Sequence, residues 1–73
     1  MSKETYILFH SSNYAMWAAD ELKIKGLVHR IVPVPRELSS DCGYCINISS
    51  EDSESAVKIL EEKNIELDRI AAV

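Results

Sequence analysis

The stretch Thr5-Tyr-Ile-Leu-Phe-His-Ser-Ser12 decides the fold, because a similar stretch, Tyr44-Cys-Ile-Asn-Ile-Ser-Ser50, occurs in the second half of the chain. In both, a short apolar strand runs into a pair of serines. A serine oxygen can accept a hydrogen bond from the unpaired amides of a helix's first turn, so each pair predicts the start of a helix. A shift of 38 residues brings Tyr6 onto Tyr44 and also aligns the apolar residues that follow. The chain therefore consists of two similar halves.

Each predicted helix is apolar along one side only, as expected for a helix that packs on a sheet. The apolar stripes consist of Ala15, Ala18, Ala19 and Leu22 in the first helix and of Ala56, Val57 and Leu60 in the second. We expect the helices to end at Gly26 and Asn64, two residue types that tolerate a positive φ. A further strand follows each helix, at residues 28–34 and 67–73.

Two strand-helix-strand halves give the order β-α-β-β-α-β, which predicts an α+β, ferredoxin-like two-layer sandwich. Its four-stranded antiparallel sheet has the spatial strand order 4-1-3-2, and both helices cover one face. A parallel sheet is less suitable, because two helices cannot cover both of its faces. With 73 residues, the whole chain (1–73) is expected to form one domain.

Composition narrows the function classes. The formal net charge of -4 argues against binding to nucleic acid, which needs a basic surface that neutralises phosphates. The longest apolar stretch, residues 14–19, is far shorter than the roughly 20 residues of a membrane helix, so no membrane contact is expected. The first residues lack the basic segment and apolar region of a secretory signal, which predicts a reducing cytoplasm and reduced cysteines.

The acidic excess lies in the C-terminal part of the chain. Residues 46–73 hold seven acidic and three basic side chains. A solvated helix face is the simplest interpretation of this pattern. The acidic second helix could also serve as a docking surface for basic partner proteins.

The predicted topology brings residues that are distant in sequence to one end of the sheet. The first and third strands are central antiparallel neighbours, so the end of the first lies beside the beginning of the third. The residues expected to meet there are His10, Ser11, Ser12, Cys42 and Gly43. A thiol reacts as the thiolate, and a helix amino end or a cation lowers its pKa. Gly43 would leave the sulfur open to a partner, whereas the carboxylate of Asp41 would oppose thiolate formation.

The connection between the two halves is longer than a hairpin turn requires. Prolines stiffen its beginning, and it extends over residues 35–43 where two to five residues would suffice. Arg36 is a cation on this loop, six residues before Cys42. A plain connection rich in turn-forming residues is the simpler alternative to a functional loop.

Cys42-Gly-Tyr-Cys45 has the spacing of a thiol redox site and of half a zinc site. A second cysteine pair is missing, and His10 and His29 would complete a zinc site only by tertiary coincidence, so we expect no metal and no cofactor. A disulfide needs Cα atoms closer than about 7 Å, whereas an extended backbone separates residues 42 and 45 by about 10 Å. Only a turn at Gly43 would close it. Redox or sensor use, with Cys45 as a second thiol, stays an alternative.

Alternation along the third strand predicts that Ile46 and Ile48 face the helices and that Cys45 faces the open side of the sheet. If Tyr6 and Leu8 of the first strand face the helices, Ile7 and Phe9 join Cys45 on the open side. Such an uncovered apolar patch would suit a homodimer or another protein partner.

At these residues the chain resembles a family of small selenium/sulfur carrier-like domains, over about residues 6–70. The resemblance rests on Phe9-His-Ser-Ser12 with Ala15 and Ala18, on Gly26, and above all on Pro35-Arg-Glu-Leu-Ser-Ser-Asp-Cys-Gly43. It implies that Cys42 is the carrier residue and that Gly43, Arg36, Ser39 and Ser40 shape its loop. Cys45 departs from the family pattern, in which a small or apolar residue is expected.

The resemblance implies a carrier protein rather than a stand-alone enzyme. Cys42 would take sulfur or selenium from a donor persulfide or selenopersulfide, such as that of a cysteine desulfurase, and pass it to an acceptor enzyme. Exchange at sulfur depends on thiolate fraction and access, which an exposed loop supplies. A noncatalytic interaction module and a thiol redox or sensor domain that uses Cys42 and Cys45 are the alternative functions.

Overall fold

The computed structural model describes residues 4–38 and 43–72 of the chain, and these form one sheet and two long helices. The elements, in chain order, are β1 (Glu4–Leu8), α1 (Ser12–Ile24), β2 (His29–Pro33), the short 3-10 helix η1 (Arg36–Leu38), β3 (Tyr44–Ser49), α2 (Ser50–Glu62) and β4 (Arg69–Ala72). This is the predicted β-α-β-β-α-β order with one added helical turn. No helix in the described part of the chain combines the length and the apolarity needed to cross a membrane.

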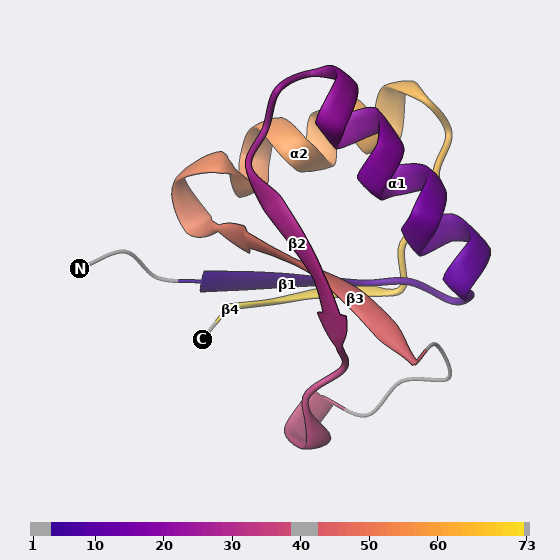
Figure 1. Cartoon of the computed structure of the whole chain (residues 1–73), viewed down its shortest axis with the longest axis vertical. Coiled ribbons are helices and arrows are strands. Elements are labelled where there is room, and N and C mark those ends of the chain that lie inside the picture. The colour runs from indigo at the N-terminus through magenta and orange to yellow at the C-terminus, as the bar shows by residue number, and fades with distance from the viewer. Residues whose placement is uncertain (1–3, 39–42, 73) are drawn as a thin grey trace.

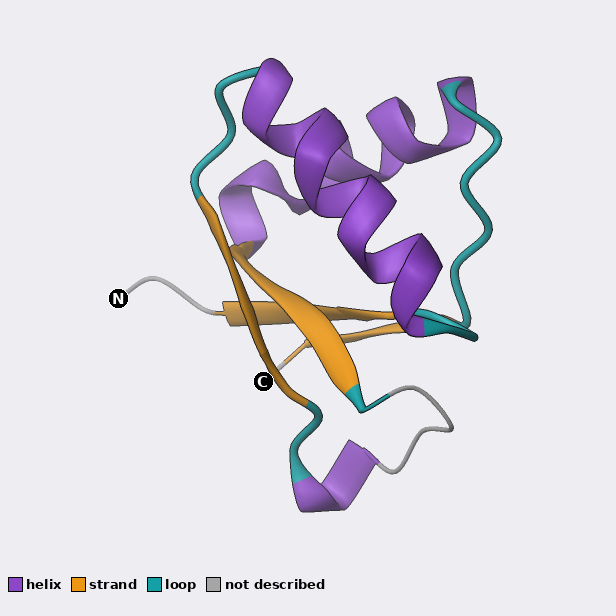
Figure 2. Cartoon of the chain, turned by 45° about the vertical axis from the view of Figure 1, so that its right-hand side comes forward, coloured by secondary structure: helices purple, strands orange, loops and turns teal. Residues whose placement is uncertain are grey.

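The strands form one antiparallel sheet in the order β2-β3-β1-β4, which confirms the predicted order. Each strand-helix-strand half leaves one strand position between its own two strands, and the other half fills that position with its first strand. α1 and α2 lie on the same face of the sheet, and no helix of the described residues covers the opposite face (Figures 1 and 2). The result is the two-layer α+β fold expected from the repeat.

The helix boundaries follow from the capping residues of the repeat. Ser11 caps α1 by accepting a hydrogen bond from the amide of Tyr14 at 3.4 Å, and Ser49 caps α2 by accepting one from the amide of Glu51 at 3.3 Å. At the other ends, Gly26 and Asn64 have φ values of 77° and 59°. These left-handed residues turn the chain back towards the sheet, so both predicted helix ends are confirmed.

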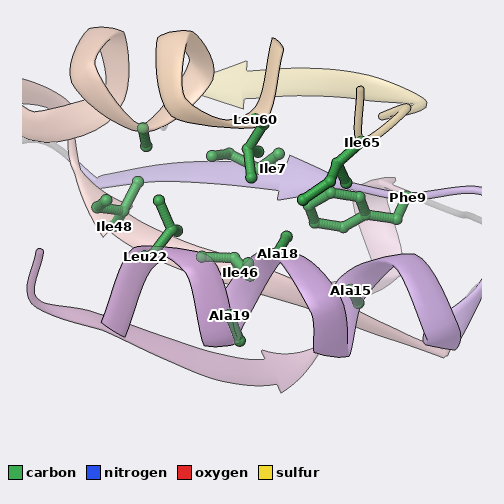
Figure 3. Packing of buried hydrophobic residues seen from close by; sticks show 11 residues of the cluster. Ile7, Phe9, Ala15, Ala18, Ala19, Leu22, Ile46, Ile48, Leu60 and Ile65 are labelled. Atoms are coloured by element: carbon green, nitrogen blue, oxygen red, sulfur yellow. The ribbon is translucent and has the colours of Figure 1, made fainter. Parts of the chain in front are cut away.

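The core lies between the sheet and the two helices. Its members come from all layers and are fully or almost fully buried; they are Ile7, Phe9, Ala15, Ala18, Ala19, Leu22, Ile46, Ile48, Ala56, Leu60 and Ile65. Figure 3 shows Phe9 and Ile65 at one end of this cluster and Ile48 with Leu22 at the other. Small alanines on α1 let the helix approach the sheet closely, and larger side chains fill the remaining space.

One prediction about the sheet faces is wrong. Ile7 lies opposite Ile46, and both belong to the core, so Ile7 and Phe9 face the helices and not the open side. Cys45 does face away from the helices, as predicted, and its cross-strand neighbour on that face is Leu8. Residues 6–9 are all apolar, so the strand offered no polar side from which its orientation could be inferred.

The open face is less apolar at its surface than the sequence suggested. Leu8 and Cys45 have no exposed surface there, whereas Arg30 and Arg69 on the outer strands are exposed. The exposed apolar area is therefore smaller than a face with Ile7 and Phe9 would present. A homodimer through this face stays a prediction.

Candidate functional site

Three connecting segments meet at one end of the sheet. The last residue of β1, Leu8, lies opposite Cys45 near the beginning of β3. The carbonyl of Leu8 also accepts a hydrogen bond of 2.7 Å from the amide of Asp68, in the connection between α2 and β4. Figures 1 and 2 both show the amino end of α1 and the beginning of β3 at this end of the sheet, which we call the reactive pole.

The amino end of α1 is built by residues 10–12, directly after the buried Phe9. Ser11 is half-buried and holds the first turn through two contacts: its hydroxyl accepts from the amide of Tyr14, and its carbonyl accepts from the amide of Ala15 at 3.3 Å. His10 and Ser12 are exposed on either side of this cap. Ser11 therefore positions the helix end, while His10 and Ser12 are accessible to a partner.

The two repeated helices differ in charge at their amino ends. α2 has Glu51 and Asp52 in its first turn, whereas α1 has no acidic residue there. The residues at the corresponding positions of α1 are Asn13 and Tyr14. Since the aligned peptide dipoles favour negative charge at a helix amino end, the end of α1 is open to an external anion, whereas α2 supplies carboxylates of its own. Sequence reasoning missed this contrast, although the aligned repeat contains it.

The loop between β2 and β3 leaves the sheet at the same end as the beginning of β3. The amide of Val34 donates to the carbonyl of Gly43 at 3.1 Å, which continues the pairing of the two strands by one step. Beyond it, Leu38 donates to the carbonyl of Pro35 at 2.9 Å and closes the turn of η1. Figures 1 and 2 show η1 beyond the end of β2 and apart from α1. The exposed Arg36 thus belongs to the hairpin and not to the α1 junction.

The predicted carrier residue Cys42 and the loop residues Ser39 and Ser40 lie outside the described residues. Gly43, which follows Cys42 directly, is exposed. Its φ is not in the left-handed region, and a Cβ added at this position would have none of the described atoms within 4 Å. Neither backbone strain nor contact with the described part of the chain therefore requires glycine at position 43.

Cys45 and the histidines are arranged differently from a zinc site. Cys45 is fully buried and faces the open side of the sheet. His29 lies opposite Ile48, three residues further along β3, and its Nδ1 is 2.9 Å from the carbonyl oxygen of Leu27. Because Ile48 faces the helices, His29 and Cys45 lie on opposite faces and cannot share a metal ion. Within the described ranges, no three His, Cys, Asp or Glu residues gather as metal ligands do.

The structure thus brings together part of the predicted set. His10, Ser11 and Ser12 lie at the end of β1, and Gly43 precedes the strand that starts beside it. Arg36 extends from the neighbouring hairpin. The reactive pole combines an exposed imidazole, an exposed hydroxyl and a helix amino end without acidic residues in its first turn, a setting that favours an anion.

Comparison with known proteins gives one family. The sequence model of the family described as "Putative Se/S carrier protein-like" matches residues 4–72. No curated protein and no solved structure matched the chain.

Proposed function

The chain belongs to this Se/S carrier-like family, and from that membership we propose that it carries sulfur or selenium as a persulfide or selenopersulfide on Cys42. The proposed role is transfer between protein partners. A donor such as a cysteine desulfurase would load the chain, and a sulfur- or selenium-accepting enzyme would unload it. The reducing cytoplasm is the proposed compartment, because Cys42 must be a thiol before each loading step.

The observation that carries the proposal is the acid-free amino end of α1 at the reactive pole. Both helices begin at a serine cap, yet α2 neutralises its own amino end with Glu51 and Asp52 and α1 does not. A thiolate or persulfide anion near the amino end of α1 would gain the stabilisation that the two carboxylates gain in α2. Because α1 and α2 are equivalent elements of the repeat, the first turn of α2 is a direct reference for that of α1.

The proposed chemistry needs no external oxidant or reductant. The thiolate of Cys42 attacks the outer sulfur of the donor persulfide, a new S–S bond forms, and the old S–S bond breaks. Its electron pair leaves with the inner donor sulfur, which becomes a thiolate. A nucleophilic thiolate of the acceptor then attacks the outer sulfur on Cys42, and Cys42 leaves as a thiolate. The same two steps apply when the outer atom is selenium.

The other residues of the predicted site would support these two steps. Ser11 fixes the helix end, and the exposed His10 and Ser12 can donate hydrogen bonds to an incoming persulfide. In the loop, the family resemblance assigns Arg36, Ser39, Ser40 and Gly43 to shaping the approach to Cys42. The guanidinium of Arg36 is exposed and adds a positive charge to that approach.

Intact-mass spectrometry tests the proposal directly. The protein is incubated with a cysteine desulfurase and cysteine, and the adduct is measured on the wild type, Cys42→Ser and Cys45→Ser. We expect the mass of one added sulfur on the wild type and on Cys45→Ser, and none on Cys42→Ser. An adduct that persists in Cys42→Ser would contradict the assignment of the carrier residue.

The same measurement separates the alternative functions. If Cys42 gains no sulfur, the noncatalytic interaction module is the function that remains. A loss of two hydrogens on mild oxidation, abolished in either cysteine variant, would indicate a redox or sensor domain that uses Cys42 and Cys45. The burial of Cys45 argues against that domain, because a partner thiol cannot reach a sulfur without exposed surface unless the sheet region opens.

A further inference from the structure

A second surface lies on the side of the molecule formed by α2 and β4. Side chains of both elements line a groove of about 460 Å³; they are Ser53, Glu54, Val57, Lys58, Glu61 and Ile70. Val57 is half-buried and Ile70 is 44% exposed, so apolar surface remains accessible in this groove. We call it the α2–β4 groove.

The β4 wall of this groove is the edge of the sheet. In the order β2-β3-β1-β4, β4 pairs with β1 on one side, and among the described strands it has no neighbour on the other. An edge strand offers backbone donors and acceptors to an additional strand. Ile70 faces the helix layer because it lies opposite the core residue Ile7, and its side chain therefore reaches the groove beside the edge.

The helical wall of the groove is acidic. Glu54 and Glu61 are exposed and lie two turns apart on α2, about 10 Å along the helix axis. Lys58 lies between them and is the one basic residue of α2, which also contains Glu51, Asp52 and Glu62. The helix thus holds five acidic side chains and one basic side chain. Its electrostatic field favours a positively charged occupant.

We propose that the α2–β4 groove binds an extended segment of a partner protein as a fifth strand beside β4, and that the side chains of this segment that face the helix layer are an apolar residue flanked by basic ones. Backbone pairing with β4 would supply affinity that does not depend on sequence. Side chains alternate along a strand, so every second residue of the segment faces the helix layer. Within that set, an apolar side chain packs on Val57 and Ile70, and a basic side chain two residues before it and another two residues after it reach Glu54 and Glu61 at the rim.

The proposal is independent of sulfur transfer. The groove residues lie on α2 and β4, and none of them belongs to the reactive pole. A carrier could use the groove to recognise a partner while its loop reacts, but the binding itself needs no cysteine chemistry. Its test can therefore be carried out on Cys42→Ser, so that the two proposals fail separately.

NMR titration of the full chain provides the test. The probe is the capped heptapeptide Thr-Lys-Thr-Val-Thr-Lys-Thr, whose two lysines and central valine share one face of a strand. The controls are Thr-Glu-Thr-Val-Thr-Glu-Thr and the basic peptide with its central valine replaced by proline. We expect the basic peptide to shift the amide resonances of Ile70, Ala71 and Ala72, with a dissociation constant below about 1 mM. Hydrogen exchange should slow at alternate β4 amides only, those that point away from β1. The acidic and proline peptides should cause neither change.

A matched pair of double variants tests the charge contribution. Glu54→Gln with Glu61→Gln removes two carboxylates from the groove, whereas Glu51→Gln with Glu62→Gln removes two from α2 outside it. We expect the first pair to weaken binding roughly fivefold, as for rim charges, and the second to weaken it by less than about twofold. Val57→Ser tests the apolar contact and should also weaken binding.

Three results would overturn the proposal. The first is the absence of shifts at Ile70, Ala71 and Ala72 with the basic peptide at about 1 mM. The second is equal binding of the acidic peptide. The third is an equal effect of the two double variants, since it would mean that the peptide binds the acidic side chains of α2 without preference for those in the groove. Circular dichroism of each variant checks that the fold is retained.

Discussion

Replacing Asn13 with glutamate should stabilise the protein and slow its reaction with sulfur donors at the same time. Asn13 is the exposed second residue of α1, and Glu51 occupies the corresponding position in α2. A carboxylate in the first turn of a helix contributes about 0.3–1 kcal/mol through the helix dipole. For a domain of this size, that free energy corresponds to a rise in melting temperature of about 1–8 °C.

The proposed function implies that the same carboxylate opposes thiolate formation on Cys42, because its negative charge repels the ionised form. Two like charges about 10 Å apart repel each other by about 0.4 kcal/mol in water and by about 1.7 kcal/mol at an effective dielectric constant of about 20. At a pH below the thiol pKa, the thiolate fraction then falls between about 2-fold and about 17-fold.

The assay measures both effects on the same samples. Urea unfolding gives the change in stability, and the pH dependence of Cys42 alkylation by iodoacetamide gives the change in thiolate fraction. Asn13→Gln is the neutral control at the same position, and Glu51→Gln is the reverse change at the equivalent position of α2. We expect Glu51→Gln to lower stability and to leave the alkylation profile unchanged.

Salt provides a further check, because about 1 M salt shortens the screening length to about 3 Å and should suppress both effects of Asn13→Glu. An Asn13→Glu variant that is stabilised but keeps the wild-type alkylation profile of Cys42 would refute this mechanism, since the amino end of α1 would then not act on the sulfur.

The remaining predictions concern packing, backbone and assembly. Gly43→Ala should change the free energy of unfolding by less than about 0.5 kcal/mol, because no described atom would touch the new Cβ; urea unfolding measures this, and slower sulfur loading would show that the partner needs the space. Leu8→Ala should cost about 2–5 kcal/mol in the same measurement, because Leu8 is fully buried on the face without helices, and a cost below about 1 kcal/mol would contradict that burial. Gly26→Ala should cost about 1–2 kcal/mol because φ is 77° there, and an unchanged unfolding midpoint would count against the left-handed helix end. Light scattering at increasing concentration checks the predicted homodimer, which a constant mass of one chain would exclude.

Much of the fold could be predicted because the same signals for strand and helix ends occur in both halves of the chain. A serine pair after an apolar strand, and a residue tolerant of positive φ after a helix, are local signals that act within a few residues. Ser11, Ser49, Gly26 and Asn64 all have the predicted roles. The strand order then followed from the rule that two such halves interleave.

The candidate site could be predicted only in part. The meeting of the end of β1 with the beginning of β3 follows from topology, and the register of Leu8 with Cys45 agrees with it. The expected closeness of Arg36 to the Cys42 sulfur stays a prediction, because Cys42 lies outside the described residues. The structure shows that η1, which contains Arg36, lies apart from α1 (Figure 2).

The amino-acid sequence alone determined the order of the elements, the helix ends and the family, because these depend on local capping, on period and on a motif. Only the tertiary structure decided which face of the sheet each residue of β1 occupies. Residues 6–9 are all apolar, so the sequence does not show which of them point towards the helices. The pairing of Ile7 with the core residue Ile46 determines this orientation. The α2–β4 groove likewise exists only once an edge strand and a helix from separate segments lie together.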